Sequence, residues 1–475
     1  MNSVPVQSRG WKWVIIALVA ADIASVFEIG MVFSALPTFY RLFDDPALVG
    51  WILTAYMLVA AAAAAIGGRL GDIFGRSQVL IAMSLLALLG SLISACSDGL
   101  TGLIIGRGIQ GVSAAILPLC FGLVQERVPV SRVPLCIGIV AGTASTAGGI
   151  AFVCGGLIID YLNWHWIFYI SSVVASLCLL LVLLLLPASV ATARNQKLDI
   201  VGGLLFAPGI AGLLFALSKG ASWGWLDSRL LGLGLGSVLL LGFWGWYEAR
   251  HVNPLIDVRL FGNRQLALTN LIHALIGLGV MHFALVLFPL LQQPVATGAG
   301  LGLAATMAAL LKLPSSLVAV FASPWAGSIA GRHGARRAML IALTFMCVGW
   351  TTLTLHHGNF WLIAVIVSIN GIGAAMAFSA IPNLIAEEAP KERISEINGL
   401  TQVIRMTFMA IGAQLYSMIF AAHRVPDSLN PGTSYLNADA FNVSFAVITL
   451  FCVLAWGAAV LLPRRSVTFV AVAQS

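Results

Sequence analysis

The sequence predicts an all-α protein that crosses a membrane fourteen times. Of its 475 residues, 60% are hydrophobic and only 9% are charged, whereas about a quarter of the residues in an ordinary soluble domain are charged. A chain of this composition has too few polar side chains to cover a water-exposed surface, and lipid removes that requirement. Its apolar residues fall into fourteen runs, each long enough for a helix to cross about 30 Å of hydrocarbon.

The fourteen runs follow one another with short polar segments between them. In order, they cover residues 13–36, 47–66, 77–96, 99–122, 135–158, 166–187, 200–218, 229–247, 266–290, 302–328, 338–356, 360–384, 397–420 and 440–462. The third and fourth runs are nearly continuous. Basic residues precede the first run, as in a signal peptide, but that run exceeds twenty residues, so we expect an uncleaved span.

The distribution of Lys and Arg tests this count, because cytoplasmic loops carry an excess of both. An even number of spans puts both ends on one side. With both ends inside, 18 of the 25 basic residues fall in inner segments. Outer loops hold Arg41, Lys219, Arg229 and Arg424, and the spans hold Arg107, Lys312 and Arg405. We therefore predict an inner (plasma) membrane protein with both termini in the cytoplasm.

Composition also narrows the classes of ligand. The net charge is +7, but the basic residues are dispersed between apolar runs, which argues against nucleic-acid binding. All seven cysteines fall within apolar runs, without metal-ligand spacing, so we expect no metal site and no disulfide framework. No phosphate-binding loop of the GxxxxGK[ST] type is present. The expected partners are the lipid bilayer, a small-molecule substrate and protons, without a cofactor.

Two short segments indicate an internal repeat. "GGRLGDIFGRSQ" (67–78) follows the second run, and "AGSIAGRHGARR" (326–337) follows the tenth. We expect two six-helix halves, residues 1–187 and 265–475, separated by two inserted helices in residues 188–264. Duplicated halves around a site near the membrane midplane are a transporter architecture. We therefore expect a gradient-driven transporter, not an enzyme, and a monomer.

Segment 67–78 resembles the signature loop of the major facilitator superfamily, with Gly68, Asp72, Gly75 and Arg76 in the family's positions. Four further stretches resemble the fourteen-span drug:proton antiporter branch: "FEIGMVFSALP" (27–37), "IIGRGIQGVSAA" (104–115), "KLDIVGGLL" (197–205) and "NPLIDVRLFGNR" (253–264). The resemblance implies that loop 67–78 latches a cytoplasmic gate.

The first run contains two acids, Asp22 and Glu28, although an ionised side chain within a membrane is costly and usually functional. Glu28 and Arg107 lie at similar depths, roughly 12–14 Å from the outer surface at 1.5 Å per residue, so they can meet. Asp22 faces elsewhere and lies nearer the cytoplasm. We expect Glu28, together with Asp22, to take up and release protons. Arg107 is expected to lie close to the Glu28 carboxylate in one state and to move away from it in the other. The alternative is a permanent Glu28–Arg107 pair that locks two helices together.

The second half carries basic residues near the middle of its spans. We expect Lys312, Arg405, His273 and His282 to line the substrate cavity together with Gln110. If the five embedded charges are ionised, positive charge exceeds negative, which favours an anion or a zwitterion as substrate. The alternatives are a neutral or snorkelling Lys312 and histidines that only pack.

The sequence departs from the family pattern at two places, and the first of these bears on the direction of transport. Ala151-Phe152 stand where the antiporter motif has Gly-Pro, and Gly331 replaces the acidic residue in the second loop copy. We predict proton-coupled export of a small amphipathic or drug-like molecule; the alternative is a proton symporter or facilitator that imports an organic anion. Segment 142–156 is predicted to be a close-packing helix surface, and segment 387–396 a solvated inner loop.

Overall fold

The computed structural model describes residues 10–43, 46–189, 199–252, 254, 258–295, 299–303, 305–356, 358–390, 393–426 and 434–464. The basic positions Arg9, Arg194, Lys197, Lys391 and Arg465, which support the predicted orientation, lie outside this part of the chain. The described residues form seventeen α-helices, four 3₁₀ segments and one two-stranded hairpin.

Seven helices make up the first group. They are α1 (Trp11–Leu42), α2 (Pro46–Phe74), α3 (Arg76–Ala95), α4 (Leu100–Gln110), α5 (Ile116–Arg127), α6 (Val133–Tyr161) and α7 (His165–Leu185). Two 3₁₀ segments, η1 (Gly111–Ala115) and η2 (Val130–Arg132), precede α5 and α6. The fourth predicted span is therefore α4, η1 and α5 in succession. The inserted pair is α8 (Ile200–Trp223) and α9 (Ser228–Arg250).

The second group follows η3 (Val258–Gly262). It contains α10 (Arg264–Leu278), η4 (Val280–His282), α11 (Phe283–Gln292), α12 (Ala305–Leu310), α13 (Leu313–His333), α14 (Ala335–Leu355), α15 (Phe360–Ala386), α16 (Ile394–Ala422) and α17 (Ala438–Val460). Between α16 and α17, strand β1 (Arg424–Pro426) pairs antiparallel with β2 (Ser434–Leu436). The hairpin was not predicted, because three-residue strands leave no periodic pattern.

The all-α membrane fold is confirmed. Thirteen of the described helical segments are long and apolar enough to cross a membrane, and a bent pair, Trp51–Ala64 and Ile66–Phe74, raises the number to fourteen. The two parts of that pair meet at 42°, beside the Gly67-Gly68 pair, and paired small residues are a common cause of sharp helix bends.

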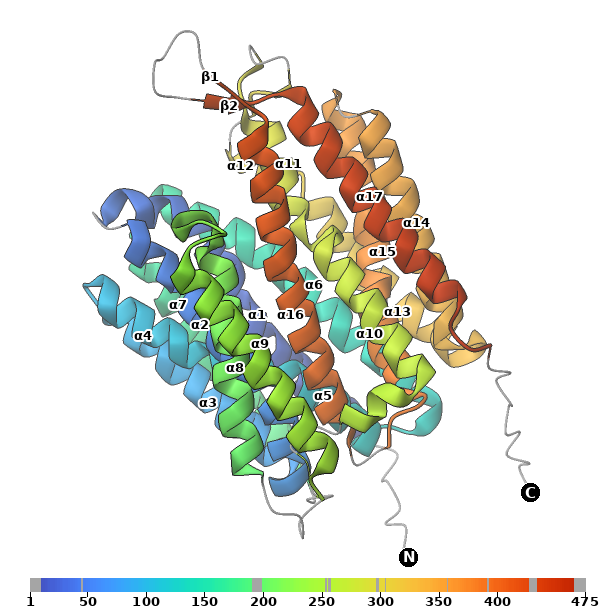
Figure 1. The fold of residues 1–475 in the computed structure, drawn as a ribbon. Coiled ribbons are helices and arrows are strands. Elements are labelled where there is room, and N and C mark those ends of the chain that lie inside the picture. Colours follow the sequence, from blue (N-terminus) through green and yellow to red (C-terminus); the bar gives the residue numbers. More distant parts are fainter. Residues whose placement is uncertain are drawn as a thin grey trace, which may run out of the picture.

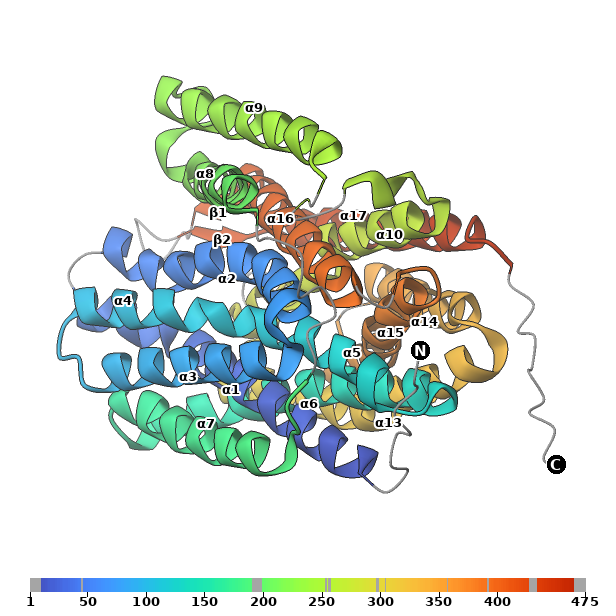
Figure 2. The same ribbon diagram turned by 90° about the horizontal axis from the view of Figure 1, so that it is seen from below.

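The two groups of helices lie side by side, with α8 and α9 on the outside (Figures 1 and 2). Helix α8 packs against α2 of the first group and α16 of the second. Helix α9 lies against α8, and its leucines at 231, 235 and 239 are exposed, as expected of a helix facing lipid. The inserted pair therefore covers one junction between the groups without entering either one.

The most extensive contacts between the groups are those of α2 with α16 and of α6 with α13; α6 also meets α15, and α5 meets α16. In the α6–α13 pair, Ser323 Oγ donates to the Gly138 carbonyl oxygen at 2.8 Å, and Thr146 Oγ1 donates to the Ser316 carbonyl oxygen at 3.2 Å. A Cβ atom on Gly149 would overlap the Ser316 side chain. The glycine-rich segment 142–156 is thus a close-packing surface, as predicted.

The two signature-like loops adopt the same turn. Gly75 has φ 99° and directly precedes α3, and Gly334 has φ 87° and directly precedes α14. Each amide donates to the carbonyl oxygen four residues earlier, Gly71 or Ala330, at 2.9 Å. A positive φ strongly favours glycine, so the repeated glycine has one structural cause in both halves.

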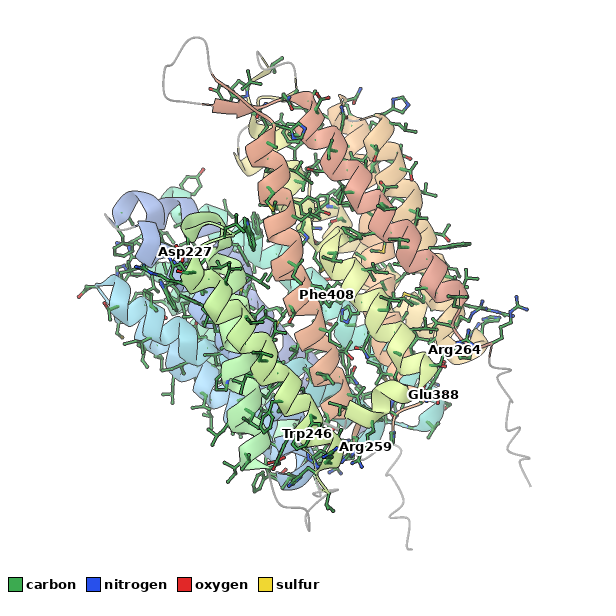
Figure 3. The ribbon with its side chains drawn as sticks, in the orientation of Figure 1. Asp227, Trp246, Arg259, Arg264, Glu388 and Phe408 are labelled. Carbon is green, nitrogen blue, oxygen red and sulfur yellow. The ribbon has the colours of Figure 1, made fainter. Side chains whose placement is uncertain are left out.

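Figure 3 places Asp227 at one end of the α8–α9 pair and Trp246 and Arg259 at the other. Arg264 and Glu388 of the second group lie toward the same end as Trp246 and Arg259. The start of α1 and the end of α17 also point this way (Figure 1). We call this the inner end of the bundle.

Gly327 and Gly331 of α13 provide a matched test of the α6–α13 contact. A Cβ on Gly327 would overlap the Pro134 carbonyl oxygen, whereas a Cβ on Gly331 would meet the Pro134 ring at 3.5 Å. Gly327→Ala should therefore lower the free energy of unfolding by about 1–3 kcal/mol relative to Gly331→Ala. Thermal unfolding in detergent measures both variants, and since each gains the same helix propensity, the difference isolates the overlap. Equal melting temperatures would contradict the close contact.

Candidate functional site

A closed ring of polar side chains surrounds Glu28. Glu28 Oε1 lies 3.6 Å from Arg107 Nη1, and Ser91 Oγ donates to Glu28 Oε2. Gln110 completes the ring, because its Nε2 donates to Ser91 Oγ at 2.9 Å and its Oε1 accepts from Arg107 Nη1 at 2.9 Å. The predicted meeting of Glu28 and Arg107 is thus present, and Gln110 lies beside them.

Small residues bring the three contributing helices together. A Cβ atom on Gly90 of α3 would lie only 2.6 Å from the Gly106 carbonyl oxygen of α4. Only a glycine at this position therefore allows the approach that places Ser91 next to Gln110. Gln110 is also the last residue of α4, directly before the 3₁₀ segment η1. Tightened turns inside a helix often mark functional hinges.

Arg107 links the ring to α2. Its guanidinium lies 4.5 Å from the centre of the Tyr56 ring, and its Nε donates to the Ile52 carbonyl oxygen at 3.4 Å. The Tyr56 hydroxyl is 3.2 Å from Ser113 Oγ. Arg107 is 1% exposed, so the carboxylate, the Gln110 amide, a backbone carbonyl and an aromatic face together compensate its buried charge.

A cavity of about 20 Å³ adjoins the ring, which is room for about one water molecule. Its lining includes Glu28, Ser25, Tyr56 and Ser84. All of the lining residues lie between positions 21 and 182. The carboxylate was expected to face a space between the two halves, but the cavity around it lies inside the first group of helices.

Asp22 lies outside this cavity. It is fully buried, and neither of its carboxyl oxygens has a hydrogen-bond partner in the described part of the chain. Only its backbone carbonyl is engaged, accepting from Ser25 Oγ at 2.8 Å. The two acids of α1 therefore have different surroundings, as their spacing predicts.

A second cluster lies where α2 meets α16. The Arg405 guanidinium is 5.5 Å from the centre of the Phe378 ring, and His273 meets the same ring edge-on at 6.5 Å. Arg405 is also within electrostatic range of Tyr56 and of His273. Arg405 and His273, predicted in one cavity, are thus neighbours. Tyr56, which was not predicted, contacts Arg107 and lies within electrostatic range of Arg405.

Lys312 and His282 lie elsewhere. Lys312 was expected near the middle of a continuous span, but that is wrong: the helix is interrupted, and Lys312 stands at the break between α12 and α13. Its ammonium lies 4.4 Å from the centre of the Phe283 ring. His282 Nε2 is 2.9 Å from the Met409 carbonyl oxygen, a contact that joins η4 to α16.

The signature-like loop forms a compact charged group at the inner end. Arg76 Nη2 lies 2.8 Å from Asp72 Oδ1, and Arg76 Nη1 donates to the Gly122 carbonyl oxygen at 2.9 Å. Asp72 is fully buried and Arg76 is 3% exposed. Gly68 lies so close to α16 that a Cβ atom would overlap the Ser395 backbone. Of the four predicted loop residues, Gly68 therefore lies at a contact between the two groups of helices, and the Asp72–Arg76 pair fixes the loop within the first group.

Segment 387–396, predicted to be a solvated inner loop, is one only in part: Pro390 is exposed, but the last three residues begin α16 and are buried, and residues 391–392 lie outside the described part of the chain. Glu396 is fully buried; its Oε2 is 3.7 Å from Arg69 Nη1 and its Oε1 is 3.7 Å from Arg393 Nη1. Glu387 Oε1 accepts from the Ala335 amide at 2.8 Å. In the sequence, this run of charges resembles a surface loop. The fold shows that Glu396 faces Arg69 of the first group of helices and that Glu387 accepts a hydrogen bond at the N-terminus of α14.

The sequence comparisons agree with this architecture. The Major Facilitator Superfamily model matches residues 18–318 and again residues 269–470. An uncharacterized MFS-type transporter of Mycobacterium tuberculosis is 26% identical over 400 residues, which cover 82% of this chain and 56% of the relative. The chain thus spans little more than half the length of that relative. Multidrug resistance protein 3 of Bacillus subtilis is 24% identical over 447 residues, 93% of this chain and 84% of the relative.

A solved structure gives the same fold. The human organic anion transporter MFSD10 superimposes with a TM-score of 0.64 at 14% identity, covering 96% of this chain and 100% of that one. The two stretches matched by the family model overlap only over residues 269–318, and each contains one copy of the repeated loop. The chain belongs to the major facilitator superfamily.

Proposed function

We propose that the protein is a proton-coupled secondary transporter that exports small amphipathic or drug-like molecules by alternating access. The observation that carries this proposal is the ring around Glu28, a buried titratable acid with its own counter-charge beside a water-sized cavity. A buried acid that serves structure alone has no need of access to water. Relatives named for multidrug resistance support a drug-like substrate.

Through the ring, protonation of Glu28 can change the position of Arg107. When Glu28 is ionised, its charge holds Arg107 beside α1 and α3. Protonation removes that charge, and Arg107 is then held mainly by the Tyr56 ring, Gln110 and the Ile52 carbonyl oxygen. Because Tyr56 also lies within electrostatic range of Arg405, a shift of Arg107 changes the electric field at the junction of the two groups of helices.

Asp22 is a candidate for a second proton position. It lies on the same helix as Glu28 but nearer the inner end, and it is fully buried. A carboxylate with no partner in such surroundings is strongly disfavoured relative to its protonated form. Asp22 can therefore accept a proton released from Glu28 toward the inside only when it is ionised, and ionisation requires water to reach it.

We propose that residues 1–187 and 265–475 rock against each other and that the inserted helices in 188–264 accompany them. The inner-end contacts of Gly68 with Ser395 and of Arg69 with Glu396 must separate for the inner end to open. The Asp72–Arg76 pair holds the loop that presents Arg69. On this proposal the signature-like loop is a latch on the cytoplasmic side of the plasma membrane.

The alternative is a proton symporter or facilitator that imports an organic anion. Two observations favour it: Lys312 and Arg405 lie inside the second group of helices, and the proline of the antiporter motif is replaced by Phe152. The two functions differ in the sign of the proton flux. In vesicles containing a pH-sensitive dye, substrate entering through an antiporter raises the internal pH, whereas substrate entering through a symporter lowers it.

Glu28→Gln should abolish substrate-driven proton flux while leaving membrane insertion intact. The amide keeps the shape and the hydrogen bond from Ser91 but cannot exchange a proton. Ethidium and other fluorescent drugs, added to proteoliposomes that enclose a pH-sensitive dye, give the measurement. Glu388→Gln is the matched control, because Glu388 lies at the inner end and bonds to Asn263. Retained proton flux in Glu28→Gln would remove the proposed role of this residue.

Glu396→Gln should favour opening of the inner end. The variant removes the charge that faces both Arg69 and Arg393, and a loss of about 1–3 kcal/mol shifts a two-state ratio by roughly five- to 150-fold. A cysteine introduced beside Ser395 and labelled with a membrane-impermeant maleimide in inverted vesicles reports the change. Glu388→Gln again serves as control. Unchanged labelling would show that the latch does not depend on this charge.

A further inference from the structure

The embedded basic residues of the second group of helices have no acidic partners. In the first group, Arg107 faces Glu28 at 3.6 Å. Across the described ranges, neither Arg405 nor Lys312 has a carboxylate within salt-bridge distance, and each guanidinium or ammonium instead faces an aromatic ring. Because a guanidinium stays protonated in proteins, Arg405 places an uncompensated positive charge in the middle of α16.

Among the described residues, the side chains around Arg405 include hydrogen-bonding groups but no carboxylate. Arg405 Nε has no hydrogen-bond partner in the described structure, and the same is true of both ring nitrogens of His273, which is only 4% exposed. Phe378 lies against both side chains. Tyr56 approaches from α2 of the opposite group. Four helices, α2, α10, α15 and α16, thus bring together a cation, an unsatisfied imidazole and two aromatic rings.

Such unsatisfied groups are costly unless something binds to them. A buried polar group without a hydrogen bond is destabilising, and a charge more so. Arg405 as a whole is partly exposed, but its Nε and both His273 ring nitrogens are buried, and the face of a single phenylalanine satisfies neither the Nε–H nor the imidazole. A carboxylate or sulfonate matches the guanidinium fork with two parallel hydrogen bonds. Its apolar body would lie against the rings of Phe378 and Tyr56.

We propose that Arg405, His273, Phe378 and Tyr56 form a subsite for an organic anion, a flat apolar molecule carrying one carboxylate or sulfonate. This inference rests on the proposed transport function and narrows its substrate class. It assigns the anion to the junction between α2 and α16, where a bound molecule touches both groups of helices. The anion would also lie next to Tyr56, the residue that connects this junction to Arg107.

Two dyes of similar shape and opposite charge test the subsite. Purified protein in nanodiscs is titrated with carboxyfluorescein, an anion, and with rhodamine 123, a cation, and fluorescence anisotropy gives each Kd without a proton gradient. We expect tighter binding of the anion. Arg405→Gln should weaken anion binding at least about tenfold, the cost of a charged hydrogen bond, and Arg405→Lys should restore part of it. The control is Arg264→Gln, an exposed inner-end arginine that bonds to the Leu461 carbonyl oxygen.

Three results would overturn the subsite: absent anion binding, equal or tighter binding of the cation, or an Arg405→Gln Kd within twofold of the unmodified protein. If Arg405→Gln does not fold, the charge preference of the unmodified protein and the Arg405→Lys titration still decide. A failure of the anion-subsite proposal can be distinguished from a failure of proton coupling. A protein that prefers the cation but keeps Glu28-dependent proton flux would refute the anion subsite and leave the transport proposal standing.

Discussion

The buried pair of Glu28 and Arg107 constrains much of the first group of helices. An acid and a base inside a bundle require hydrogen bonds to offset the loss of water, and here Ser91 and Gln110 supply several of them, although Glu28 Oε1 and Arg107 Nη2 have no hydrogen-bond partner in the described residues. That requirement fixes the spacing of α1, α3 and α4, and it explains why Gly90 lies against the Gly106 backbone. The ring therefore joins three helices through one titratable side chain.

The two groups of helices differ in how their embedded charges are compensated. The first group pairs its arginine with an acid, whereas the second leaves Arg405 and Lys312 against aromatic rings. Tyr56 lies between the two arrangements, 4.5 Å from the Arg107 guanidinium and within range of Arg405. If the proposed subsite binds an anion, the charge of that ligand and the charge on Glu28 both act on the surroundings of this one side chain. On the proposed function, Tyr56 would link the two sites without direct contact between proton and substrate.

Sequence reasoning predicted the helices well, because a lipid environment imposes a length and a composition on every span. It also brought Glu28 and Arg107 together, because depth along a helix follows from residue number. It missed Tyr56 and Glu396, since a tyrosine in an apolar run and an acid in a charged loop are both ordinary. Ser91 had a weak signal: Ser77, Ser84 and Ser91 repeat every seven residues on α3 and are all buried. The break at Lys312 had a signal that was not used: Pro314 stands in the first turn of α13, where proline favours a helix start.

The two copies of the signature-like loop show how one backbone can serve two tasks. Gly75 and Gly334 make the same turn, but Asp72 and Arg76 of the first copy correspond to Gly331 and Ala335 of the second. The second copy obtains its negative charge from Glu387, which accepts the Ala335 amide. It touches the first group through the close approach of Gly327 to Pro134, without a charge. The first copy instead reaches across with Arg69 to Glu396. An ion pair can break and re-form as water enters, whereas close backbone packing changes little over small rotations. The first copy packs closely as well, since Gly68 lies against the Ser395 backbone, so the asymmetry between the two copies lies in the added ion pair of the first.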